Sequence, residues 1–418
     1  MTVLIAGAGI GGLTLGLSLH QLGIPFRIFE TVNEIRPLGV GINVQPHAIR
    51  ELYDLGLETE LESVGLRTRE VAYFSAQGGL IWAEPRGEYA GYNWPQYSIH
   101  RGHMQLLLLN ALQDRAGPDV VEKGAAVLGW RERSDGVEIT LGDRSSNQVS
   151  GTVQGRAFVA ADGINSRARA GLYPAEGSAN WGGVMMWRGV TRGPKFLTGR
   201  TMAMAGRKAC KFVCYPIAEY DDGTCMINWI ADQMLPKDYK WRVQDWNRAG
   251  NRADFAPAFA DWSFDWLDIP ALIAQSDSIF EYPMVDRNPL PAWTHGPMTL
   301  LGDAAHAMYP IGSNGASQAI LDARVLAREL RDHQVGRDAL EAYDIARRET
   351  VNALVLATRG DGPDKVLDVV AERAPDGFAD IADVMSRAEL EAVASGYKKM
   401  AGMDIETLNN RGPLVPMP

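Results

Sequence analysis

The sequence Val3-Leu4-Ile5-Ala6-Gly7-Ala8-Gly9-Ile10-Gly11-Gly12 carries the clearest fold signal in the chain. A short apolar run leads into glycines spaced Gly7-x-Gly9-x-x-Gly12, and leucines recur through residues 13–22. This order predicts a strand, a tight turn and a helix. The first glycine permits the turn, the second lets the backbone approach a pyrophosphate, and the third lets helix pack on strand. The segment therefore predicts a Rossmann-like dinucleotide site.

An acidic residue after the next strand supports this prediction. Gly23 is expected to end the helix, and a second apolar run at residues 26–29 leads directly into Glu30. A carboxylate at this place can accept hydrogen bonds from both hydroxyls of an adenosine ribose. It also disfavours a 2′-phosphate, so the tightly bound nucleotide is not expected to be NADP.

A second nucleotide-type segment, TLLGDAAHAMYPIGSNGASQ, occupies residues 299–318. It predicts a buried strand at 298–301, the carboxylate of Asp303, a glycine-rich loop and a helix that begins at Ala316. The acid can accept hydrogen bonds from hydroxyls, and the amide groups at the helix start attract negative charge. Two such distant segments that converge on one cofactor indicate a dinucleotide.

A third motif, FVAADGINS at residues 158–166, is a predicted strand that ends in Asp162-Gly163. Taken alone, Asp-Gly indicates a turn, and the following Arg167 and Arg169 would be solvated. Its place between the two nucleotide segments favours a role at the same cofactor.

Composition narrows the class of protein. The chain has 418 residues and a formal net charge of −10, which suits two domains with substantial cores. No basic run is present, so nucleic-acid binding is not expected. Cys210, Cys214 and Cys225 form no CxxC pair, which favours reduced thiols and no metal site. Without a basic n-region or a long apolar run, we expect no signal peptide, no membrane span and a cytoplasmic location.

The three motifs together resemble those of the FAD-dependent aromatic hydroxylases, the para-hydroxybenzoate hydroxylase superfamily. Residues 34–42, 95–102 and 282–287 look most like the methylphenazine-carboxylate monooxygenase branch. The resemblance implies bound FAD, NADH or NADPH as a transient reductant, and O2 as oxidant. It implies hydroxylation, through C4a-hydroperoxyflavin, of an aromatic or N-heteroaromatic acid such as a phenazine, pyridine or phenolic carboxylate. Decarboxylation would accompany it if the carboxylate-bearing carbon faces the flavin.

The resemblance also implies roles for cofactor residues. Glu30 would bind the adenosine ribose, Arg101 and Gln105 the phosphate and ribityl region, and Asp303 a ribityl hydroxyl. Asp162 would serve both FAD and the nicotinamide donor, and residues 310–316 would line the flavin ring. One departure is Ala160-Ala161, where Gly-Ala is commoner. The expected cofactor-binding residues are Gly7, Gly9, Ile10, Gly11, Gly12, Glu30, Arg101, Gln105, Asp162, Asp303, Gly312, Asn314, Gly315 and Ala316.

The expected fold is α/β, with an interleaved Rossmann-like FAD-binding domain, a mixed β-sheet substrate domain and C-terminal helices. Strand-like runs without long helices between them occupy residues 183–230, whereas residues 316–348 and most of 351–408 look helical. The tail after residue 411 is expected to fray. The FAD-binding domain is predicted from 1–75, 101–178 and 283–350, the substrate domain from 76–100 and 179–282, and the helical region from 351–418.

Substrate contacts are expected from the β-rich middle of the chain. Alternation places Lys211 and Tyr215 on one strand face, where Lys211 can pair with a substrate carboxylate or phenolate. The alternative is an exposed lysine beside a sheet-edge tyrosine. Arg188 and Asn228 compete for the same role, although Arg188 also suits a structural one, and Tyr309 lies at the junction of cofactor and substrate. The candidate catalytic residues are Pro310, Tyr215 and His306.

His306 has two interpretations, a packed histidine beside the cofactor or a proton relay. Two other functions stay open at this point. A flavin halogenase needs a Trp-x-Trp-x-Ile-Pro segment, whereas Trp262 and Trp266 are spaced more widely. A non-catalytic FAD-binding protein is the second. The expected partners are a small aromatic acid, O2 and NAD(P)H, in a monomer or homodimer.

Overall fold

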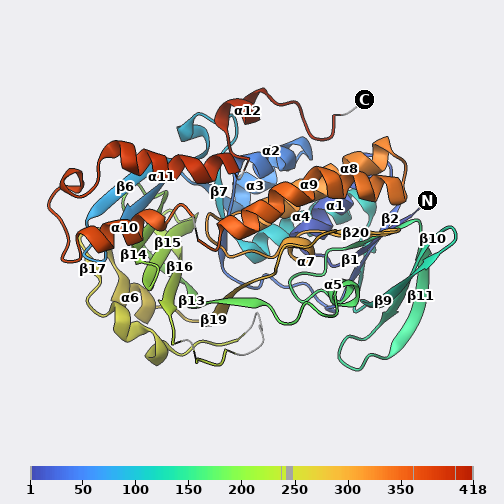
Figure 1. Cartoon of the computed structure of the whole chain (residues 1–418), viewed down its shortest axis with the longest axis horizontal. Helices are drawn as coiled ribbons and strands as arrows, with labels where there is room; N and C mark the ends of the chain where they lie inside the picture. Colours follow the sequence, from blue (N-terminus) through green and yellow to red (C-terminus); the bar gives the residue numbers. More distant parts are fainter. Residues whose placement is uncertain (1, 237, 242–247, 361, 401, 417–418) are drawn as a thin grey trace.

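Two large β-sheets organise the computed structural model, which describes residues 2–236, 238–241, 248–360, 362–400 and 402–416 (Figure 1). The first sheet has six strands in the order β20-β21-β12-β1-β2-β8, all parallel except for the β20–β21 pair. Every residue of β1 is buried, as expected for a parallel sheet covered on both faces. Its strands are β1 (Val3–Ala6), β2 (Phe26–Glu30), β8 (Val121–Lys123), β12 (Ala157–Ala160), β20 (Thr294–His295) and β21 (Met298–Leu300).

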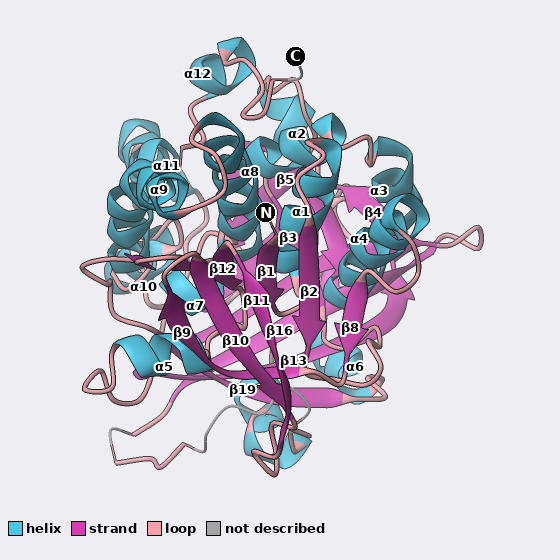
Figure 2. Cartoon of the chain, turned by 90° about the vertical axis from the view of Figure 1, so that its right-hand side faces the viewer, coloured by secondary structure: helices cyan, strands magenta, loops and turns pink. Residues whose placement is uncertain are grey.

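Helices cover one face of this sheet, and a three-stranded meander lies on the other face (Figure 2). Val137, Ile139 and Leu141 of the meander alternate into the same core as β1 and β12. The meander strands are β9 (Ala126–Arg133), β10 (Gly136–Gly142) and β11 (Val149–Gly155). The helices of this half are α1 (Ile10–Gln21), α2 (Pro46–Asp54), α3 (Glu58–Val64), α4 (Arg101–Ala116), α5 (Arg167–Leu172), α7 (Asp303–His306), α8 (Gly315–Asp332) and α9 (Arg337–Ala357).

The second sheet has seven strands in the order β19-β13-β16-β15-β14-β5-β6. Only the β14–β5 pair is parallel, so the sheet is mixed. One face packs against an aromatic-rich core under α6, and α10 packs near the other. The strands are β5 (Glu70–Phe74), β6 (Leu80–Pro85), β13 (Asn180–Pro194), β14 (Thr201–Arg207), β15 (Cys210–Glu219), β16 (Thr224–Met234) and β19 (Ile279–Asp286); the helices are α6 (Ile269–Ala274) and α10 (Lys365–Arg373).

Smaller elements complete the chain. A three-stranded sheet, β3-β7-β4, contributes residues of β3 to the candidate site, and α11 lies near α9. No helix within the described ranges has the length and apolar character needed to span a bilayer. These elements are β3 (Gly41–Val44), β4 (Gly65–Arg67), β7 (Tyr97–His100), β17 (Ser263–Phe264), β18 (Leu267–Asp268), α11 (Arg387–Met400) and α12 (Ile405–Asn410).

The chain crosses between the two large sheets repeatedly, which confirms the predicted interleaved α/β fold. The parallel sheet takes its strands from residues 3–30, 121–160 and 294–300, and the mixed sheet takes its strands from the intervening segments. β5 pairs with β14 in the mixed sheet, although it falls within residues 1–75 of the predicted cofactor domain. The exact domain limits stay a prediction.

Two local expectations were wrong. The expected helix at 316–348 breaks between α8 and α9. Residues 411–416 do not fray, since Arg411 pairs with the buried Glu51 at 2.9 Å and Val415 is 2% exposed.

Candidate functional site

A cavity of about 300 Å³ lies where the cofactor motifs meet the mixed sheet. Segments that are far apart in the sequence contribute to it, from the first glycine turn to the loop before α10. Fourteen of the predicted site residues line it: Gly9, Ile10, Gly11, Arg101, Arg188, Lys211, Tyr215, Asp303, Tyr309, Pro310, Gly312, Asn314, Gly315 and Ala316. Gly7, Gly12, Glu30, Gln105, Asp162, Asn228 and His306 are not among its lining residues.

The N-terminal glycines make the turn between β1 and α1 possible. Gly7 has φ +99°, and a Cβ there would collide with the carbonyl of Ala161. A Cβ on Gly12 would collide with the carbonyl of Gly7, so the third glycine allows helix and strand to approach. A Cβ on Gly9 would meet nothing within 4 Å, and Gly9 lines the cavity. The middle glycine therefore leaves open space at the turn.

Glu30 and Gln105 hold the peptide groups of this turn. The amide of Ala8 donates to Glu30 Oε2 at 2.8 Å, and Gln105 Nε2 donates to the Ala8 carbonyl at 2.8 Å. The amide of Val32 donates to Glu30 Oε1 at 3.0 Å. Both predicted cofactor residues thus fix the backbone beside the place where a pyrophosphate would approach.

Arg101 stands at the start of α4 and lines the cavity. Burial lowers its pKa, and the nearby carboxylate of Asp303 opposes this shift. Two predicted cofactor residues from distant motifs are therefore electrostatic neighbours at this cavity.

Asp162 follows the end of β12 by two residues and lies beside the same turn. Its Oδ2 accepts from the amide of Arg167 at 2.9 Å, whereas its buried Oδ1 has no hydrogen-bond partner among the described residues. Burial raises the pKa of this carboxyl above its usual range. An enclosed acceptor of this kind is costly unless a donor reaches it. Asp162 does not line the cavity, so its role at the cofactor stays a prediction.

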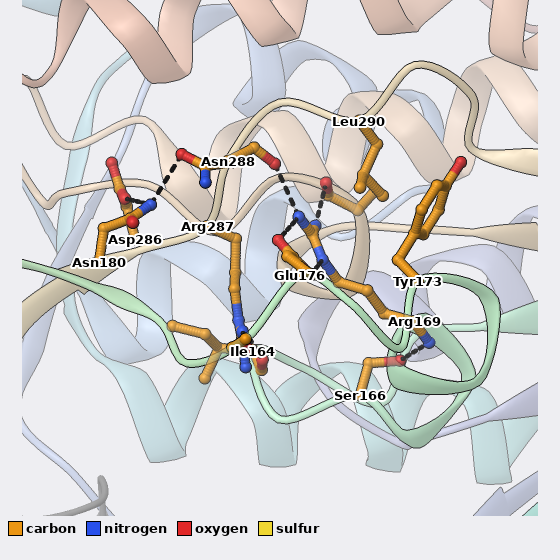
Figure 3. Close-up of polar contacts among 12 residues, drawn as sticks. Ile164, Ser166, Arg169, Tyr173, Glu176, Asn180, Asp286, Arg287, Asn288 and Leu290 are labelled. Atoms are coloured by element: carbon orange, nitrogen blue, oxygen red, sulfur yellow. Dashed lines mark hydrogen bonds and ion pairs between the residues drawn. The ribbon is translucent and has the colours of Figure 1, made fainter.

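Arg169 is buried and joins three segments, as Figure 3 shows. Its Nη1 donates to the Ala305 carbonyl at 2.7 Å, its Nη2 to the Asn288 carbonyl at 2.7 Å, and its Nε to Glu176 at 2.7 Å. The solvated alternative for Arg169 does not hold, because these carbonyls and one carboxylate replace water around the guanidinium. The side chain ties the Asp162 motif to α7.

Asp322, on α8, stabilises the Gly302-Asp303 segment through hydrogen bonds. Gly302 has φ +62°, and its amide donates to Asp322 Oδ2 at 3.2 Å. His306 Nε2 lies 2.5 Å from the same oxygen, and Arg347 Nε donates to Asp322 Oδ1 at 2.8 Å. His306 is buried and absent from the cavity lining, so its surroundings favour the packed interpretation.

The loop at residues 310–316 forms the cavity wall and ends in α8. Asn314 Nδ2 donates to the Gly312 carbonyl at 3.1 Å, which braces the turn. A Cβ on Gly315 would meet nothing within 4 Å. The first amides of α8 lack intrahelical partners, as in any helix, so this wall presents donors toward open space.

One face of the mixed sheet forms the opposite wall. The registers place Arg188 opposite Ile230, Ile230 opposite Val213, and Val213 opposite Met204. All four line the cavity, and the alternate residues face the aromatic core. This wall is mainly apolar and includes the thioethers of Met186, Met202, Met204 and Met284.

Arg188 and Asn228 both hold Gly41, the first residue of β3. Arg188 Nη2 donates to the Gly41 carbonyl at 2.9 Å, and the Gly41 amide donates to Asn228 Oδ1 at 2.6 Å. A Cβ on Gly41 would press on Asn228 and Tyr215. Asn228 therefore lies behind the cavity wall and supports it, whereas Arg188 also lines the cavity.

Arg188 lines the cavity and keeps an unpartnered donor. Its Nε is enclosed and has no hydrogen-bond partner, and the side chain pairs with no carboxylate among the described residues. Burial raises the pKa of Tyr215 to about 12, and the nearby charge of Arg188 opposes this shift. Tyr215 is therefore a neutral phenol at physiological pH.

Lys211 is already paired. Its Nζ lies 2.5 Å from Asp364 Oδ2 and 3.6 Å from Asp232 Oδ2. Burial lowers the pKa of Lys211, but these two carboxylates outweigh burial and raise it. Sequence reasoning missed both acids. Asp232 follows the Asn228 run on β16, and alternation along that strand would have placed it on the same face.

Comparisons with known proteins agree with this site. The FAD binding domain family matches residues 1–358. The chain is 43% identical over 404 residues to phenazine 1,6-dicarboxylic acid hydroxylase PhzS of Lysobacter antibioticus, covering 95% of this chain and 96% of that protein. It is 33% identical over 358 residues to aurachin C monooxygenase/isomerase of Stigmatella aurantiaca, covering 85% and 87%.

A solved structure shares the fold over nearly its whole length. Klebsiella pneumoniae HpxO complexed with FAD and uric acid has a TM-score of 0.73 at 24% identity, covering 98% of this chain and 96% of that one. Because the relatives are named hydroxylases and monooxygenases, the comparisons favour ring oxygenation over halogenation or non-catalytic FAD binding.

Proposed function

Because this chain belongs to the FAD binding domain family and is an FAD-dependent aromatic hydroxylase, we propose that it hydroxylates a planar N-heteroaromatic acid whose carboxylate is bound by Arg188. The observation that carries the proposal is the Arg188 guanidinium. It lines the cavity with an unpartnered Nε and no carboxylate partner among the described residues. Charge-assisted hydrogen bonds from arginine to carboxylates are among the strongest in proteins.

The residues present fit FAD. Gly9 and Gly315 leave open space at two cavity walls, where any side chain would block a bound group. We assign the pyrophosphate to the Gly9 turn and the α8 N-terminus, and a ribityl hydroxyl to Asp303. When bound and reduced by NADH or NADPH, FAD supplies the activated oxygen for ring hydroxylation.

The protein's own contribution is orientation and water exclusion. Arg188 fixes the acid, and the neutral Tyr215 hydroxyl supports Arg188 and holds its proton at physiological pH. Methionines give the sheet wall an adaptable apolar surface that suits a flat ring. Tyr309 and Pro310 cover the junction between the cofactor loop and this wall. These contacts would hold a ring edge in line with the reacting oxygen and keep water out.

The substrate class is supported by the relatives. The Lysobacter relative is named for a phenazine dicarboxylic acid, and a Pseudomonas fluorescens relative at 28% identity is named for 6-hydroxynicotinate. Both are N-heteroaromatic acids. They therefore favour this class over simple phenols for the present cavity.

The test is a substrate screen with an isotope readout. Purified holoenzyme would be given NADH or NADPH under ¹⁸O₂ with phenazine, pyridine and benzene carboxylates. We expect at least one N-heteroaromatic acid to stimulate reductant oxidation and to gain one ¹⁸O atom by mass spectrometry. Stimulated oxidation that yields only hydrogen peroxide for every acid would refute the proposed substrate class.

A further inference from the structure

The charged side chains of the sheet wall gather at one end of the cavity. Met186 on β13, Asp232 on β16 and Lys211 on β15 stand directly opposite one another in the registers. Arg188 lies two residues after Met186 on the same face of β13, so it is a diagonal neighbour of Asp232. Such diagonal positions lie about 7–8 Å apart. An acid and a second substituent on one ring, or on fused rings, can therefore meet both side chains.

The cluster of Asp232, Lys211 and Asp364 has one base and two acids. Asp364 and Pro363 both lie in the loop before α10, and both line this end of the cavity. The side chains of Asp232, Lys211 and Asp364 are 5%, 8% and 15% exposed. When all three are ionised, the cluster carries one net negative charge in a poorly solvated place. Lys211 is therefore not available to neutralise a further anion.

Asp232 also has unused acceptor capacity. Its Oδ1 is enclosed and has no hydrogen-bond partner among the described residues, although Asp232 itself lines the cavity. The neighbouring side chains of Met186 and Met284 donate no hydrogen bonds. A buried acceptor that lacks a partner is stabilised by any donor that reaches it. A donor on a bound ring is the group that this arrangement suits.

We propose that Asp232 is a specificity-determining residue that accepts a hydrogen bond from a hydroxyl, amino or ring N–H group of an aromatic monocarboxylate. The Asp232–Lys211–Asp364 cluster disfavours a second carboxylate at this end, because that group would meet one net negative charge in a poorly solvated place. The inference rests on the proposed function, which places the first carboxylate at Arg188. It differs from the dicarboxylic acid for which the Lysobacter relative is named.

The experiment compares three matched ligands by titration of FAD absorbance in the oxidised holoenzyme. The probes are phenazine-1-carboxylate with a 6-hydroxyl group, the same acid with a 6-methoxy group, and phenazine-1,6-dicarboxylate. We expect the hydroxy acid to bind about 10- to 100-fold more tightly than its methyl ether, the range of a hydrogen bond to a charged group. The dicarboxylate is also expected to bind more weakly than the hydroxy acid.

Two substitutions separate the acceptor from the charge. Asp232→Asn keeps a carbonyl acceptor but removes the negative charge, so it should raise dicarboxylate affinity about tenfold relative to the hydroxy acid. Asp232→Leu removes the acceptor and should bring the hydroxy-to-methoxy ratio close to one. Lys211 keeps Asp364 in both variants, and FAD content and melting temperature report whether each folds. Asp222→Asn, in the exposed turn between β15 and β16, is the matched control and should change neither ratio.

Equal affinity for the hydroxy acid and its methyl ether in the wild-type protein would overturn the inference. Ratios that stay unchanged in both Asp232 variants would do the same. The proposed function fails separately, if acids bind with these ratios but none gains oxygen in the ¹⁸O₂ assay. Absence of binding by all three acids would count against both.

Discussion

Arg188 shows how one side chain takes two roles at the residue scale. It fixes the Gly41 carbonyl at 2.9 Å while its Nε remains without a partner. Lys211, which also lines the cavity, is already paired with the carboxylates of Asp364 and Asp232. Of these two cavity cations, the local ion pairs make Arg188 the one that is available to a substrate anion.

Substituting Arg188→Met should weaken acid binding about 10- to 100-fold, since a charge-assisted hydrogen bond contributes about 1.5–3 kcal/mol. Titration of FAD absorbance with an aromatic acid measures this Kd. Lys211→Met is the informative companion, because it should have a smaller effect on the Kd of a monocarboxylate. If Lys211→Met weakens binding of the acid more than Arg188→Met does, the substrate carboxylate has been assigned to the wrong side chain.

Gly9 and Gly12 offer a second contrast at this scale. Gly12→Ala should lose both stability and FAD, because its Cβ would collide with the Gly7 carbonyl. Gly9→Ala meets nothing within 4 Å, so its apo form should melt within about 2 °C of the wild type. Its FAD affinity should still fall, since the methyl group enters the space of the pyrophosphate. Thermal melting of apo protein and FAD titration test the pair, and full FAD affinity in Gly9→Ala would move the pyrophosphate elsewhere.

At the scale of elements, the features that can be predicted are those whose defining residues all lie within one short segment of the sequence. The glycine turn and the place of Glu30 follow from local spacing, because each depends on residues that lie close together in the sequence. The Lys211–Asp364 pair joins residues 153 positions apart, and no local pattern indicates it. β14 falls inside the strand-rich segment predicted at residues 183–230, although its first six residues are all buried and show no alternation of apolar and polar side chains. The solvated alternative for Arg169 stayed open because its partners include backbone carbonyls, which the sequence does not distinguish.

Arg169 gives the prediction that belongs to this scale, since it fastens the segment around α5 to α7. Arg169→Met should cost about 3–5 kcal/mol, because it leaves Glu176 and several carbonyls without their buried cation. Arg167→Met removes only exposed hydrogen bonds to Arg144 and Asn147 and should change stability by less than about 1 kcal/mol. Urea unfolding of both variants measures the difference. Equal stability would mean that the α5–α7 connection does not depend on Arg169.

At the scale of the whole molecule, the C-terminal segment closes the structure over the first half of the chain. Arg411 reaches the fully buried Glu51 on α2, which Arg324 also approaches at 3.4 Å. Asn409 bonds the Gly91 carbonyl at 2.8 Å, and the side chain of Val415 is buried. Residues near the end of the sequence therefore contribute to the core beside the cofactor half.

Removing this contact should lower global stability. Arg411→Met leaves Glu51 with a weaker set of partners, and we expect a loss of about 1.5–3 kcal/mol in the free energy of unfolding, the usual contribution of a hydrogen bond to a charged group. Arg387→Met is a suitable control, because its i,i+4 pair with Glu391 is largely exposed. The melting temperatures of the two variant holoenzymes, compared with the wild type, test this prediction. If Arg387→Met lowers the melting temperature as much as Arg411→Met does, the effect is a general one of removing an arginine.

The interleaving of the two sheets has an evolutionary consequence. A gene cut at any single point between residues 30 and 294 separates strands of the parallel sheet from one another, since β1 and β2 precede the cut and β21 follows it. Exchange of the whole mixed sheet as one contiguous cassette would also carry β8 and β12 of the parallel sheet, because these strands lie between β6 and β13 in the sequence. The wall of β13–β16 is contiguous and can change apart from the parallel sheet, and we expect substitutions at Asp232 and Arg188 to act most directly on substrate preference.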